Sequence, residues 1–490
     1  MSDSRLAVVV LAAGQGTRMR SSRAKVLHPI AGVPLLGHVL ATARELDPAF
    51  VVTVVRHQRD AVAEAVDEYL PSSIVVDQDE VPGTGRAVEQ AVEALPAGFD
   101  GDIVVLSGDV PLLDAVTLSG LLDAHRRALA GATVLSALLA DATGYGRVVR
   151  DPSGEFERIV EHRDAGDAEL GIGEINSGVY AFSVAALRTA LPRITSANAQ
   201  GEKYLTDAIA LMRSTGAPVA AVPVAEPWIV EGINDRVQLS EQAARLNAMI
   251  VRRWQREGVT VHDPRSTWID LDVTLAEDVE LLPGTRLAGA TTVDRFAVIG
   301  PDTTLVGCEV GEGASVVRTD ATLAVIGAHA SVGPFAYLRP GTELGAGGKI
   351  GTYVETKNAR IGRGSKVPHL SYIGDAEIGE GTNIGAGGIT ANYDDLAKHR
   401  TIIGSHVHTG AHNVFVAPVE LGDGSKVGAG AVIRKDVPAG ALAISVAPQR
   451  NRLGWTEEHR AGTDAASAAA ASASGTAAAS GSASGTAPGS

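Results

Sequence analysis

A short loop with two glycines follows the first aliphatic run of the chain. It spans Leu11–Met19, includes Gly14, Gly16 and Arg18, and is followed by Lys25. Glycines let backbone N–H groups come close to a phosphate, and the two cations would neutralise its charge. The loop lacks the third glycine of the dinucleotide fingerprint and the Gly-Lys-Ser/Thr of the Walker loop. It therefore predicts a phosphate site of another kind, with a tight turn carrying two solvated cations as the alternative.

Two further motifs are placed to serve the same site. Asp109 follows the apolar run Ile103–Leu106, and a carboxylate at the end of a buried strand can hold Mg²⁺ against phosphate oxygens. A cap on the following turn is the alternative role for this aspartate. Gly83-Thr84-Gly85 precedes a helical pattern, where it would lie against a nucleobase or a phosphate, although this motif is weak by itself.

A histidine in the second half of the chain has the chemistry of a base. His369 lies within Lys366–Tyr372, and histidine is the side chain best suited to accept a proton near pH 7. A structural histidine is the alternative interpretation. His406, His408 and His412 alternate nearby, which is typical of a solvated outer row rather than of a metal site.

Alternating strands and helices must position the motifs of the first half. We expect buried strands rich in Val and Ile at Leu6–Ala12, Val51–Val55, Ile74–Val76 and Ile103–Leu106, and helices at Val33–Leu46, Arg59–Tyr69 and Arg86–Leu95. This repetition predicts an α/β fold with a Rossmann-like, doubly wound sheet. Such sheets bind ligands at the carboxyl ends of their strands, which is where the glycine loop and Asp109 lie.

The hydrophobic period changes after a connecting helix. Residues 236–258 show helical spacing that ends at Trp254, and Gly258 stands at a C-cap position. From residue 259 aliphatic residues recur every six positions, as at Ile326, Val332, Leu338, Leu344 and Ile350. A hexapeptide period predicts a parallel β-helix, whereas a glycine-rich disordered segment, the alternative, would have no period.

Glycine usage agrees with this change of architecture. Of the 56 glycines, 31 lie between residues 256 and 462, where the coil needs tight turns. Two stretches, Thr352–Arg360 and Thr390–Arg400, break the repeat. We interpret the second as a loop that leaves the coil, and such loops often carry function.

Composition limits the classes of function. The chain has 490 residues, with 42 Lys and Arg against 57 Asp and Glu, which gives a formal net charge of −15. An acidic chain is poorly suited to general nucleic-acid binding, and no run approaches the ~18 apolar residues of a membrane helix. A single cysteine, Cys308, excludes an internal disulfide, and we expect it to be packed in the core. We expect a cytoplasmic protein with a disordered Ala/Ser/Gly-rich tail over residues 456–490.

Taken in order, the motifs resemble those of one enzyme family. The Leu11–Met19 loop with Lys25, Gln78 with Gly83–Gly85, and Asp109 are similar to those of sugar-1-phosphate nucleotidyltransferases. Further matches are at Thr143–Arg147, Ile159–His162, Glu174–Gly178 and Val230–Asp235. From about Leu6 to Pro448 the chain resembles the bifunctional bacterial N-acetylglucosamine-1-phosphate uridylyltransferase/glucosamine-1-phosphate N-acetyltransferase family.

This resemblance implies two activities on two domains. Glucosamine-1-phosphate would be acetylated by acetyl-CoA, and UMP would then pass from UTP to give UDP-N-acetylglucosamine and pyrophosphate for cell-wall precursors. It implies a uridylyltransferase domain at residues 1–235, a linker helix at 236–258, and an acetyltransferase domain at 259–455 built as a left-handed β-helix. It also implies a homotrimer through the β-helix, with small-molecule substrates and no nucleic-acid or membrane partner.

The resemblance assigns three groups of residues to uridylyl transfer. The uridine nucleotide would contact Leu11, Ala12, Gly14, Arg18, Lys25, Gln78, Gly83 and Thr84; the sugar phosphate would contact Gly146, Glu161, Asn176 and Asn234; and Asp109 with Asn234 would bind Mg²⁺. In-line attack of the sugar phosphate oxygen on the α-phosphorus of UTP needs positioning and charge stabilisation rather than a protein nucleophile.

For acetyl transfer the resemblance makes His369 the general base. The glucosamine phosphate would contact Arg339, Lys357, Tyr372, Asn383 and Glu355, and acetyl-CoA would contact Ala386, Asn392, Tyr393, Lys398, Ala411 and Ala429. Two positions depart from many relatives, which have Ser in place of Ala411 and Arg in place of Val446.

Two other functions stay open on the sequence. One is a nucleotidyltransferase whose β-helix is only a scaffold, and the other is a non-catalytic assembly protein. A pure scaffold has no need of His369 with its neighbouring cations, and an assembly protein has no need of a phosphate loop with Asp109 and Asn234.

Overall fold

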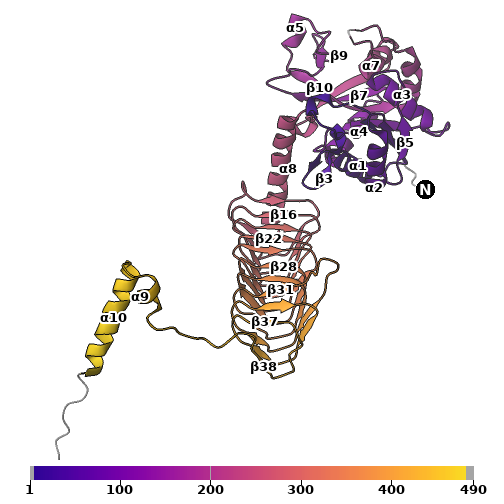
Figure 1. Ribbon diagram of the computed structural model, residues 1–490. Helices are drawn as coiled ribbons and strands as arrows, with labels where there is room; N and C mark the ends of the chain where they lie inside the picture. Colours follow the sequence, from indigo (N-terminus) through magenta and orange to yellow (C-terminus); the bar gives the residue numbers. More distant parts are fainter. Residues whose placement is uncertain (1–4, 199, 482–490) are drawn as a thin grey trace, which may run out of the picture.

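The computed structural model describes residues 5–198 and 200–481. Figure 1 shows an N-terminal α/β part, a long helix α8 that leads away from it, a column of stacked β-coils, and a C-terminal arm that stands apart from the column. This order is the α/β architecture followed by a β-helix that the change of hydrophobic period predicts.

The N-terminal part is built on a nine-stranded sheet whose main path runs β11-β7-β10-β6-β1-β4-β5. Its strands are β1 (Leu6–Ala12), β4 (Phe50–Val55), β5 (Ile74–Asp77), β6 (Asp102–Ser107), β7 (Ala132–Leu138), β8 (Arg147–Arg150), β9 (Phe156–Val160), β10 (Glu174–Ser183) and β11 (Val219–Pro223), and a separate hairpin joins β2 (Pro29–Ile30) to β3 (Val33–Pro34). Strand β1 pairs in parallel with β4 and β6, whereas β10 is antiparallel to both β6 and β7.

Helices cover both faces of this sheet. They are α1 (Leu35–Glu45), α2 (Arg59–Tyr69), α3 (Thr84–Ala94), α4 (Ala115–Arg127), α5 (Asp167–Leu170), α6 (Val184–Ala190) and α7 (Leu205–Ser214). Alternate residues of β1 enter two cores, because successive strand side chains point to opposite faces. Val8 and Val10 pack with α1, α2 and α4, whereas Ala7 and Val9 pack with α3, α6 and α7. The predicted strands and helices of this half are confirmed to within two residues at their ends.

Helix α8 (Arg236–Arg256) joins the two parts of the chain. Asp235 caps its start, since the side chain accepts hydrogen bonds of 2.9 Å from the backbone N–H groups of Val237 and Gln238. Asn247 fixes the helix to the first coil by donating to Thr267 O (2.8 Å) and accepting from Ile269 N (3.0 Å). The helix thus holds the column at a defined place under the N-terminal part.

The column is a parallel β-helix with about eighteen residues per turn. Trp268 pairs with Arg286, and Arg286 pairs with Thr304 on the next coil. Its strands are β12 (Thr260–Val261), β13 (Trp268–Ile269), β14 (Thr274–Leu275), β15 (Glu280–Leu281), β16 (Arg286–Ala288), β17 (Thr292–Val293), β18 (Val298–Ile299), β19 (Thr304–Val306), β20 (Glu309–Val310), β21 (Ser315–Val316), β22 (Thr319–Thr322), β23 (Val325–Ile326), β24 (Ser331–Val332), β25 (Ala336–Leu338), β26 (Thr342–Leu344), β27 (Lys349–Thr352), β28 (Glu355–Ile361), β29 (Lys366–His369), β30 (Tyr372–Ile378), β31 (Ile389–Ala391), β32 (Thr401–Ile403), β33 (His408–Thr409), β34 (Val414–Val416), β35 (Val419–Leu421), β36 (Lys426–Val427), β37 (Val432–Ile433) and β38 (Leu442–Ala443). The six-residue anchors stack along its axis in one continuous core.

The two predicted interruptions behave differently. Thr352–Arg360 is not a break, because β28 runs through it and pairs Glu355 with Tyr372 at the normal coil spacing. The second interruption is a loop: Glu377 pairs with Ile402, twenty-five residues on, so the coil has expelled several residues after β31. Thr352–Arg360 therefore lacks the aliphatic pattern, but the number of residues in its coil is unchanged.

The C-terminal arm differs from the expected disorder. Helices α9 (Trp455–His459) and α10 (Asp464–Gly481) occupy most of residues 456–481, whereas residues 482–490 of the predicted tail lie outside the described residues. Alanine has the highest intrinsic helix propensity, and an alanine-rich segment can be helical without a core to pack against. The expectation of disorder rested only on the lack of a core and did not take this propensity into account.

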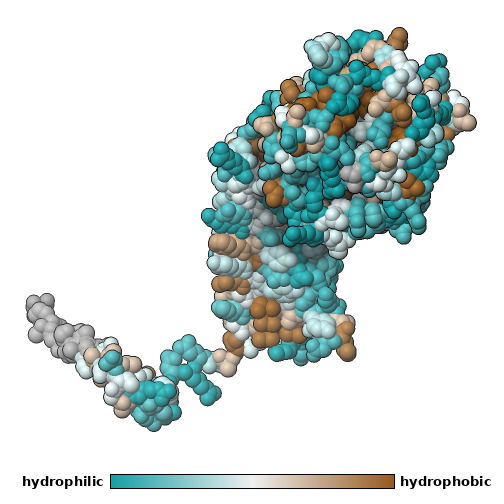
Figure 2. All heavy atoms as spheres, turned by 90° about the horizontal axis from the view of Figure 1, so that it is seen from above, coloured by the Kyte–Doolittle hydropathy of each residue, from teal (hydrophilic) through white to brown (hydrophobic). Residues whose placement is uncertain are grey.

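The surface is mostly hydrophilic on the face seen in Figure 2, with hydrophobic atoms gathered where the arm leaves the column. Exposed hydrophobic residues at that end include Leu442, Ile444 and Val446. Among the described residues, no helix is both long and apolar enough to cross a membrane.

Candidate functional site

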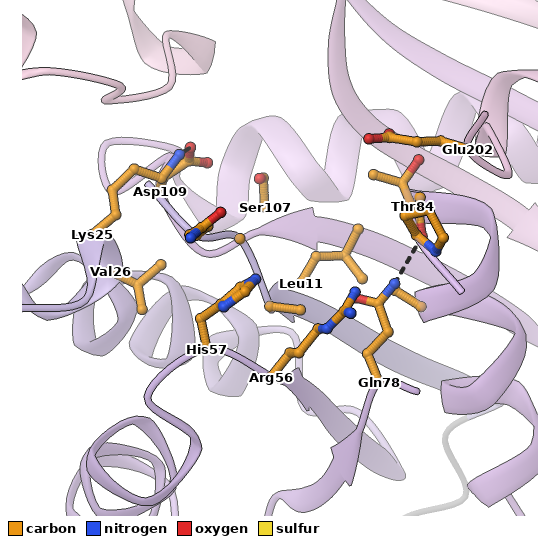
Figure 3. Close-up of a pocket in the computed structure, with 16 residues that line it drawn as sticks. Leu11, Lys25, Val26, Arg56, His57, Gln78, Thr84, Ser107, Asp109 and Glu202 are labelled. Atoms are coloured by element: carbon orange, nitrogen blue, oxygen red, sulfur yellow. Dashed lines mark hydrogen bonds and ion pairs between the residues drawn. The ribbon is translucent and has the colours of Figure 1, made fainter. Parts of the chain in front are cut away.

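A cavity of about 540 Å³ opens at the carboxyl ends of β1, β4, β5 and β6 (Figure 3). Its lining residues are Leu11, Ala13, Gly14, Gln15, Lys25, Val26, Arg56, His57, Gln78, Pro82, Gly83, Thr84, Ala87, Ser107, Asp109 and Glu202. Doubly wound sheets place their ligands at this edge. The predicted glycine loop, Gln78, Gly83, Thr84 and Asp109 therefore meet at one cavity.

The glycine loop holds Lys25 against Asp109. Gly16 has φ +62°, and a Cβ at this position would lie 2.6 Å from the Lys25 Cβ, so the tight approach requires glycine. The Lys25 ammonium forms an ion pair with the Asp109 carboxylate, and both side chains are largely buried. The loop thus brings a cation to the carboxylate at the end of β6.

A third segment, Gly232–Asn234, closes the same edge. Arg18 Nη2 donates to Asn234 Oδ1 at 2.8 Å, and the backbone N–H of Ile233 donates to Asp109 O at 2.9 Å. A Cβ on Gly232 would lie 3.6 Å from both Asp109 carboxylate oxygens. Asp109 and Asn234 are therefore neighbours, although their side-chain oxygens are held by two cations.

These two oxygen donors fit a divalent cation that the substrate helps to bind. Hard cations such as Mg²⁺ take carboxylate and amide oxygens, and often only one or two from the protein with phosphate oxygens completing the shell. The two side-chain oxygens already attract the cations Lys25 and Arg18, as they would attract a metal ion. Within the described residues, no group of three or more His, Cys, Asp and Glu side chains is placed to hold a metal by itself.

The Gln78–Thr84 segment forms the opposite wall of the cavity. Gln78 Nε2 donates to the carbonyl oxygens of Val81 (3.2 Å) and Gly83 (3.1 Å). Gly83 has φ +114°, and a Cβ there would lie 2.3 Å from Lys203 O. Thr84 begins α3, and its hydroxyl accepts from Leu205 N at 3.2 Å. The segment presents a helix N-terminus to the cavity, where the helix dipole favours an anion.

Three of the residues predicted to hold the sugar contact each other. A Cβ on Gly146 would lie 3.3 Å from Glu161 Oε2, and Asn176 N donates to Gly146 O at 2.8 Å. Burial raises the pKa of Glu161, while a 3.3 Å hydrogen bond from Thr206 opposes the shift. None of Gly146, Glu161 and Asn176 lines the main cavity, so they form a separate cluster.

Tyr145 directly precedes Gly146 in the chain. Burial raises the pKa of its phenol, and the charges of Glu231 and Asp109 add to that shift while Arg18 opposes it. Asn234, the fourth predicted sugar residue, contacts Arg18 and is therefore held in the cluster with Asp109.

Four polar residues outside the glycine loop line the cavity but were not predicted from the sequence: Arg56, His57, Ser107 and Glu202. Arg56 and His57 follow directly after β4, and Ser107 is the last residue of β6. Their position after a buried strand was the signal that could have found them, since ligands bind at strand ends. Glu202 comes from an irregular segment and has no such signal.

The second set of predicted residues lies on the β-helix. We call the face formed by β25, the first halves of β28 and β30, β31, β34 and β37 the Tyr372 face. Tyr337, Glu355 and Tyr372 occupy matching positions on successive coils, and Arg339 Nη1 contacts Glu355 Oε1 at 3.0 Å. Three of the predicted sugar-phosphate residues thus share one outer surface.

A cluster of charged side chains with two lysines lies at the edge of the Tyr372 face. Lys357 Nζ is 3.8 Å from Asp375 Oδ2, and the Lys398 ammonium is close enough to Lys357 for that neighbour to lower its pKa. Burial would raise the pKa of Asp375, but hydrogen bonds from Asn358 and Asn392 and the Lys357 charge outweigh it, so the pKa is lowered. Asn392 and Lys398 come from the expelled loop, which gives that loop a place in the site.

His369 lies on the adjoining face, which we call the His369 face: β24, β27, β29, β33, β36 and β38. The corner Leu370–Ser371 separates it from Tyr372, and Ser371 Oγ donates to His369 O at 2.7 Å. The His369 side chain is exposed, and no hydrogen bond or ion pair links it to Arg339, Lys357 or Tyr372 within the described chain. One chain therefore places the predicted base and the predicted phosphate cations on two sides of one corner.

Three of the six residues predicted for acetyl-CoA form a column beside His369, and the other three lie on the expelled loop. Backbone pairing of Asn383 with His408, and of Thr409 with Val427, puts Ala386, Ala411 and Ala429 at matching positions on successive coils. Tyr393 is 60% exposed on the expelled loop, where its hydroxyl donates to Asp395 O at 2.8 Å.

Cys308 is buried in the β-helix core, and burial raises its pKa.

Comparisons with known proteins cover nearly the whole chain. Residues 8–221 match the MobA-like NTP transferase domain, and residues 400–435 match the bacterial transferase hexapeptide (six repeats). The Bifunctional protein GlmU of Clavibacter sepedonicus is 62% identical over 464 residues, which cover 95% of this chain and 94% of that protein. The proteins of the same name from Leifsonia xyli subsp. xyli and Pseudarthrobacter chlorophenolicus are 64% identical over 469 residues, with 96% of each chain covered, and 58% identical over 465 residues, with 94% of each covered.

Proposed function

The chain belongs to the family of bifunctional GlmU proteins, and we propose that it makes UDP-N-acetylglucosamine in two steps. In the first step acetyl-CoA acetylates the amine of glucosamine-1-phosphate. In the second step UMP passes from UTP to the N-acetylglucosamine-1-phosphate, and pyrophosphate leaves. The product serves cell-wall precursor synthesis. We assign uridylyl transfer to residues 1–235, the connection to 236–258, and acetyl transfer to 259–455.

The cavity at the strand ends is the site for uridylyl transfer. Leu11 and Gly14 with Gln78, Gly83 and Thr84 line this cavity and hold the uridine nucleotide. We assign Ala12 to the same group, although it is buried at the end of β1 and does not line the cavity. Arg18 and Lys25 face the triphosphate, and the Gly146–Glu161–Asn176 cluster holds the sugar phosphate. The sugar phosphate oxygen attacks the α-phosphorus as the bond to pyrophosphate breaks. Because charge spreads over the phosphate oxygens, cations and positioning carry the reaction.

Asp109 and Asn234 are the residues that would hold the divalent metal, which we take to be Mg²⁺. When bound, the ion supplies positive charge that neutralises the nucleotide phosphates and orients them for in-line attack. In the structure, Arg18 contacts Asn234 and Lys25 contacts Asp109. Substrate phosphates would give both cations a new anionic partner and free the oxygens for the metal.

The outer surface around His369 is the site for acetyl transfer. Arg339, Lys357, Tyr372 and Asn383 bind the sugar phosphate, with Glu355 beside them. His369 accepts a proton from the C2 amine of the sugar. The amine nitrogen bonds to the thioester carbonyl carbon as the carbon–sulfur bond to CoA breaks. Acetyl-CoA lies against Ala386, Ala411 and Ala429 and the loop residues Asn392, Tyr393 and Lys398.

A second copy of the chain completes this surface in our proposal. Phe335, Tyr353 and Leu370 stand at the corner between the two faces and are 51%, 61% and 61% exposed. The rings of Phe335 and Tyr353 stack with centroids 5.5 Å apart. An exposed apolar row beside a half-open site is typical of an interface. We propose a homotrimer packed along the β-helices, acting in the cytoplasm on small molecules, with no nucleic-acid or membrane partner.

The observation that carries the proposal is the meeting of Lys25, Asp109, Arg18 and Asn234 from three distant segments at the cavity edge. A non-catalytic assembly protein would have no use for this cluster. The test is an assay with glucosamine-1-phosphate, acetyl-CoA, UTP and Mg²⁺, in which each is omitted in turn. We expect thiol release without UTP, and pyrophosphate release only when all four are present or when N-acetylglucosamine-1-phosphate replaces the first two. Pyrophosphate release without any thiol release would favour the alternative in which the β-helix is a scaffold.

A further inference from the structure

A column of polar and basic side chains runs along the His369 face. Backbone pairing sets Lys349, Lys366, Asn383, His408 and Lys426 at matching positions on five successive coils. We call this set the lysine column. The three lysines are exposed, and the strands point these side chains away from the core. Together the five residues form a straight stripe parallel to the axis of the β-helix.

Within residues 5–198 and 200–481, no acidic side chain pairs with the lysines of this column. Lys349 stands directly opposite Lys366, an arrangement of like charges that destabilises a sheet. Among the described residues, neither these two nor Lys426 forms an ion pair or a side-chain hydrogen bond. On another face the charges alternate instead: Arg360 contacts Glu343 at 3.3 Å, and Arg400 pairs with Glu377. An unpaired basic stripe on a chain of net charge −15 indicates an anionic ligand.

The distance along the axis selects one lysine. From the coil of His369 to the coil of Lys426 there are three steps, through Asn383 and His408, which span about 14 Å at the ~4.8 Å spacing of neighbouring strands. The pantetheine arm of CoA, with ordinary bond lengths and two planar amides, places the diphosphate about 15 Å from the thioester sulfur. Lys366 lies on the coil of His369 itself, and Lys349 lies one coil further from Lys426.

We propose that Lys426 binds the diphosphate of the acetyl donor and sets the affinity for acetyl-CoA; this rests on the proposed acetyl transfer at His369. With the thioester at His369, the donor runs toward the C-terminal end of the column. It lies between the lysine column and the alanines Ala386, Ala411 and Ala429. Its diphosphate then reaches the level of Lys426.

The surface between the two columns is open to such a ligand. Lys426 and Ala429 are three residues apart on one coil, at most about 10 Å between Cα atoms, and a lysine side chain spans much of that distance. Gly385, Gly410 and Gly428 stand in the row between them and carry no side chain. A Cβ on Gly410 would lie 2.5 Å from Ala429 N, so this row stays glycine. This row of glycines leaves room for the donor, and Lys426 supplies a positive charge beside the row.

Steady-state kinetics with shortened donors test the assignment. For Lys426→Ala we expect the KM for acetyl-CoA to rise about fivefold, with kcat changed by less than about twofold, because an exposed cation binds the ground and transition states of the distant thioester equally. S-acetylpantetheine has no phosphate, so with this donor kcat/KM should be the same for both proteins. With 3′-dephospho-acetyl-CoA the fivefold effect should persist, because this donor retains the diphosphate.

Two matched variants sharpen the comparison. Lys349→Ala removes the same charge from the same column on the far side of His369 and should leave the KM for acetyl-CoA unchanged. Lys426→Arg keeps the charge and should restore most of the affinity. An equal loss with S-acetylpantetheine, an unchanged KM for acetyl-CoA, or an effect that vanishes with the 3′-dephospho donor would overturn the assignment of the diphosphate to Lys426. If the unaltered chain releases no CoA thiol with glucosamine-1-phosphate, the proposed acetyl transfer itself fails, which is a separate result.

Discussion

Arg18 donates a 2.8 Å hydrogen bond to the side-chain oxygen of Asn234, a residue 216 positions further along the chain. Beside this contact, Lys25 pairs with Asp109 at the end of β6. The first glycine loop is thereby tied to the segment that leads into α8. The two pairs bring together the charges that a nucleotide triphosphate and its metal would need.

Asp109→Ala should abolish uridylyl transfer. The substitution removes one of the two oxygen ligands that we propose for the metal and leaves Lys25 without its partner, so we expect kcat/KM for UTP to fall at least about a hundredfold. Release of pyrophosphate from UTP and N-acetylglucosamine-1-phosphate measures this step. Acetyl transfer should stay near its original rate, because His369 lies on the separate β-helix. A parallel loss of both activities in a folded variant would refute the division between the two sites.

Gly83→Ala should destabilise the N-terminal part. The residue has φ +114°, and the added Cβ would meet Lys203 O at 2.3 Å, so the backbone must shift. We expect the free energy of unfolding to fall by about 2–3 kcal/mol. Urea unfolding followed by far-UV circular dichroism measures it. Gly98→Ala is the matched control, since a Cβ there meets nothing within 4 Å; equal effects at the two positions would contradict the strain argument.

Glu161→Gln should stabilise the fold at neutral pH while weakening sugar binding. Burial raises the pKa of Glu161 in the folded chain, so the charged carboxylate is less favourable there than in the unfolded chain. That penalty exists above the folded pKa and disappears below about pH 4, where the group is protonated in both states. We expect a higher Tm for the variant at pH 8 and equal Tm values at pH 4. A stabilisation that grows as the pH falls would be the wrong sign.

Asp375→Asn should have the opposite pH dependence. Hydrogen bonds from Asn358 and Asn392 and the charge of Lys357 outweigh the effect of burial and lower the pKa of Asp375. The stabilisation is therefore present above the ordinary pKa of an aspartate and is lost as the pH falls through the lowered value. We expect a loss of about 1–3 kcal/mol at pH 7 and a smaller loss in acid. Denaturant titrations at the two pH values measure the difference, and a loss independent of pH would exclude the charge as its cause.

The architecture could be predicted where the signal is local. The six-residue anchors predict the β-helix because each repeat makes the same turn. The aliphatic runs predict β1, β4 and β6, which are buried on both faces, and the half-buried edge strand β5. The helical arm was missed because helix propensity acts without a core, and Arg56 and His57 were missed because their only signal is their place after β4.

The geometry of the sites is harder to predict. Residue types alone cannot bring Arg18 to Asn234, since that contact depends on the path of the whole N-terminal chain; only the family resemblance named both. His369 and Tyr372 are three residues apart, which suggests one surface. The corner at Leu370–Ser371 places them instead on two faces, and backbone pairing decides this rather than side-chain chemistry.

The central claim, that two independent sites act in sequence, is tested most directly by mixing two single-site variants. His369→Ala should lack acetyl transfer, and Asp109→Ala should lack uridylyl transfer. Supplied with glucosamine-1-phosphate, acetyl-CoA, UTP and Mg²⁺, neither variant alone should form UDP-N-acetylglucosamine. Their mixture should form it, because N-acetylglucosamine-1-phosphate made by Asp109→Ala can diffuse to His369→Ala. No product from a mixture of two folded variants, or full product from either one alone, would contradict the account.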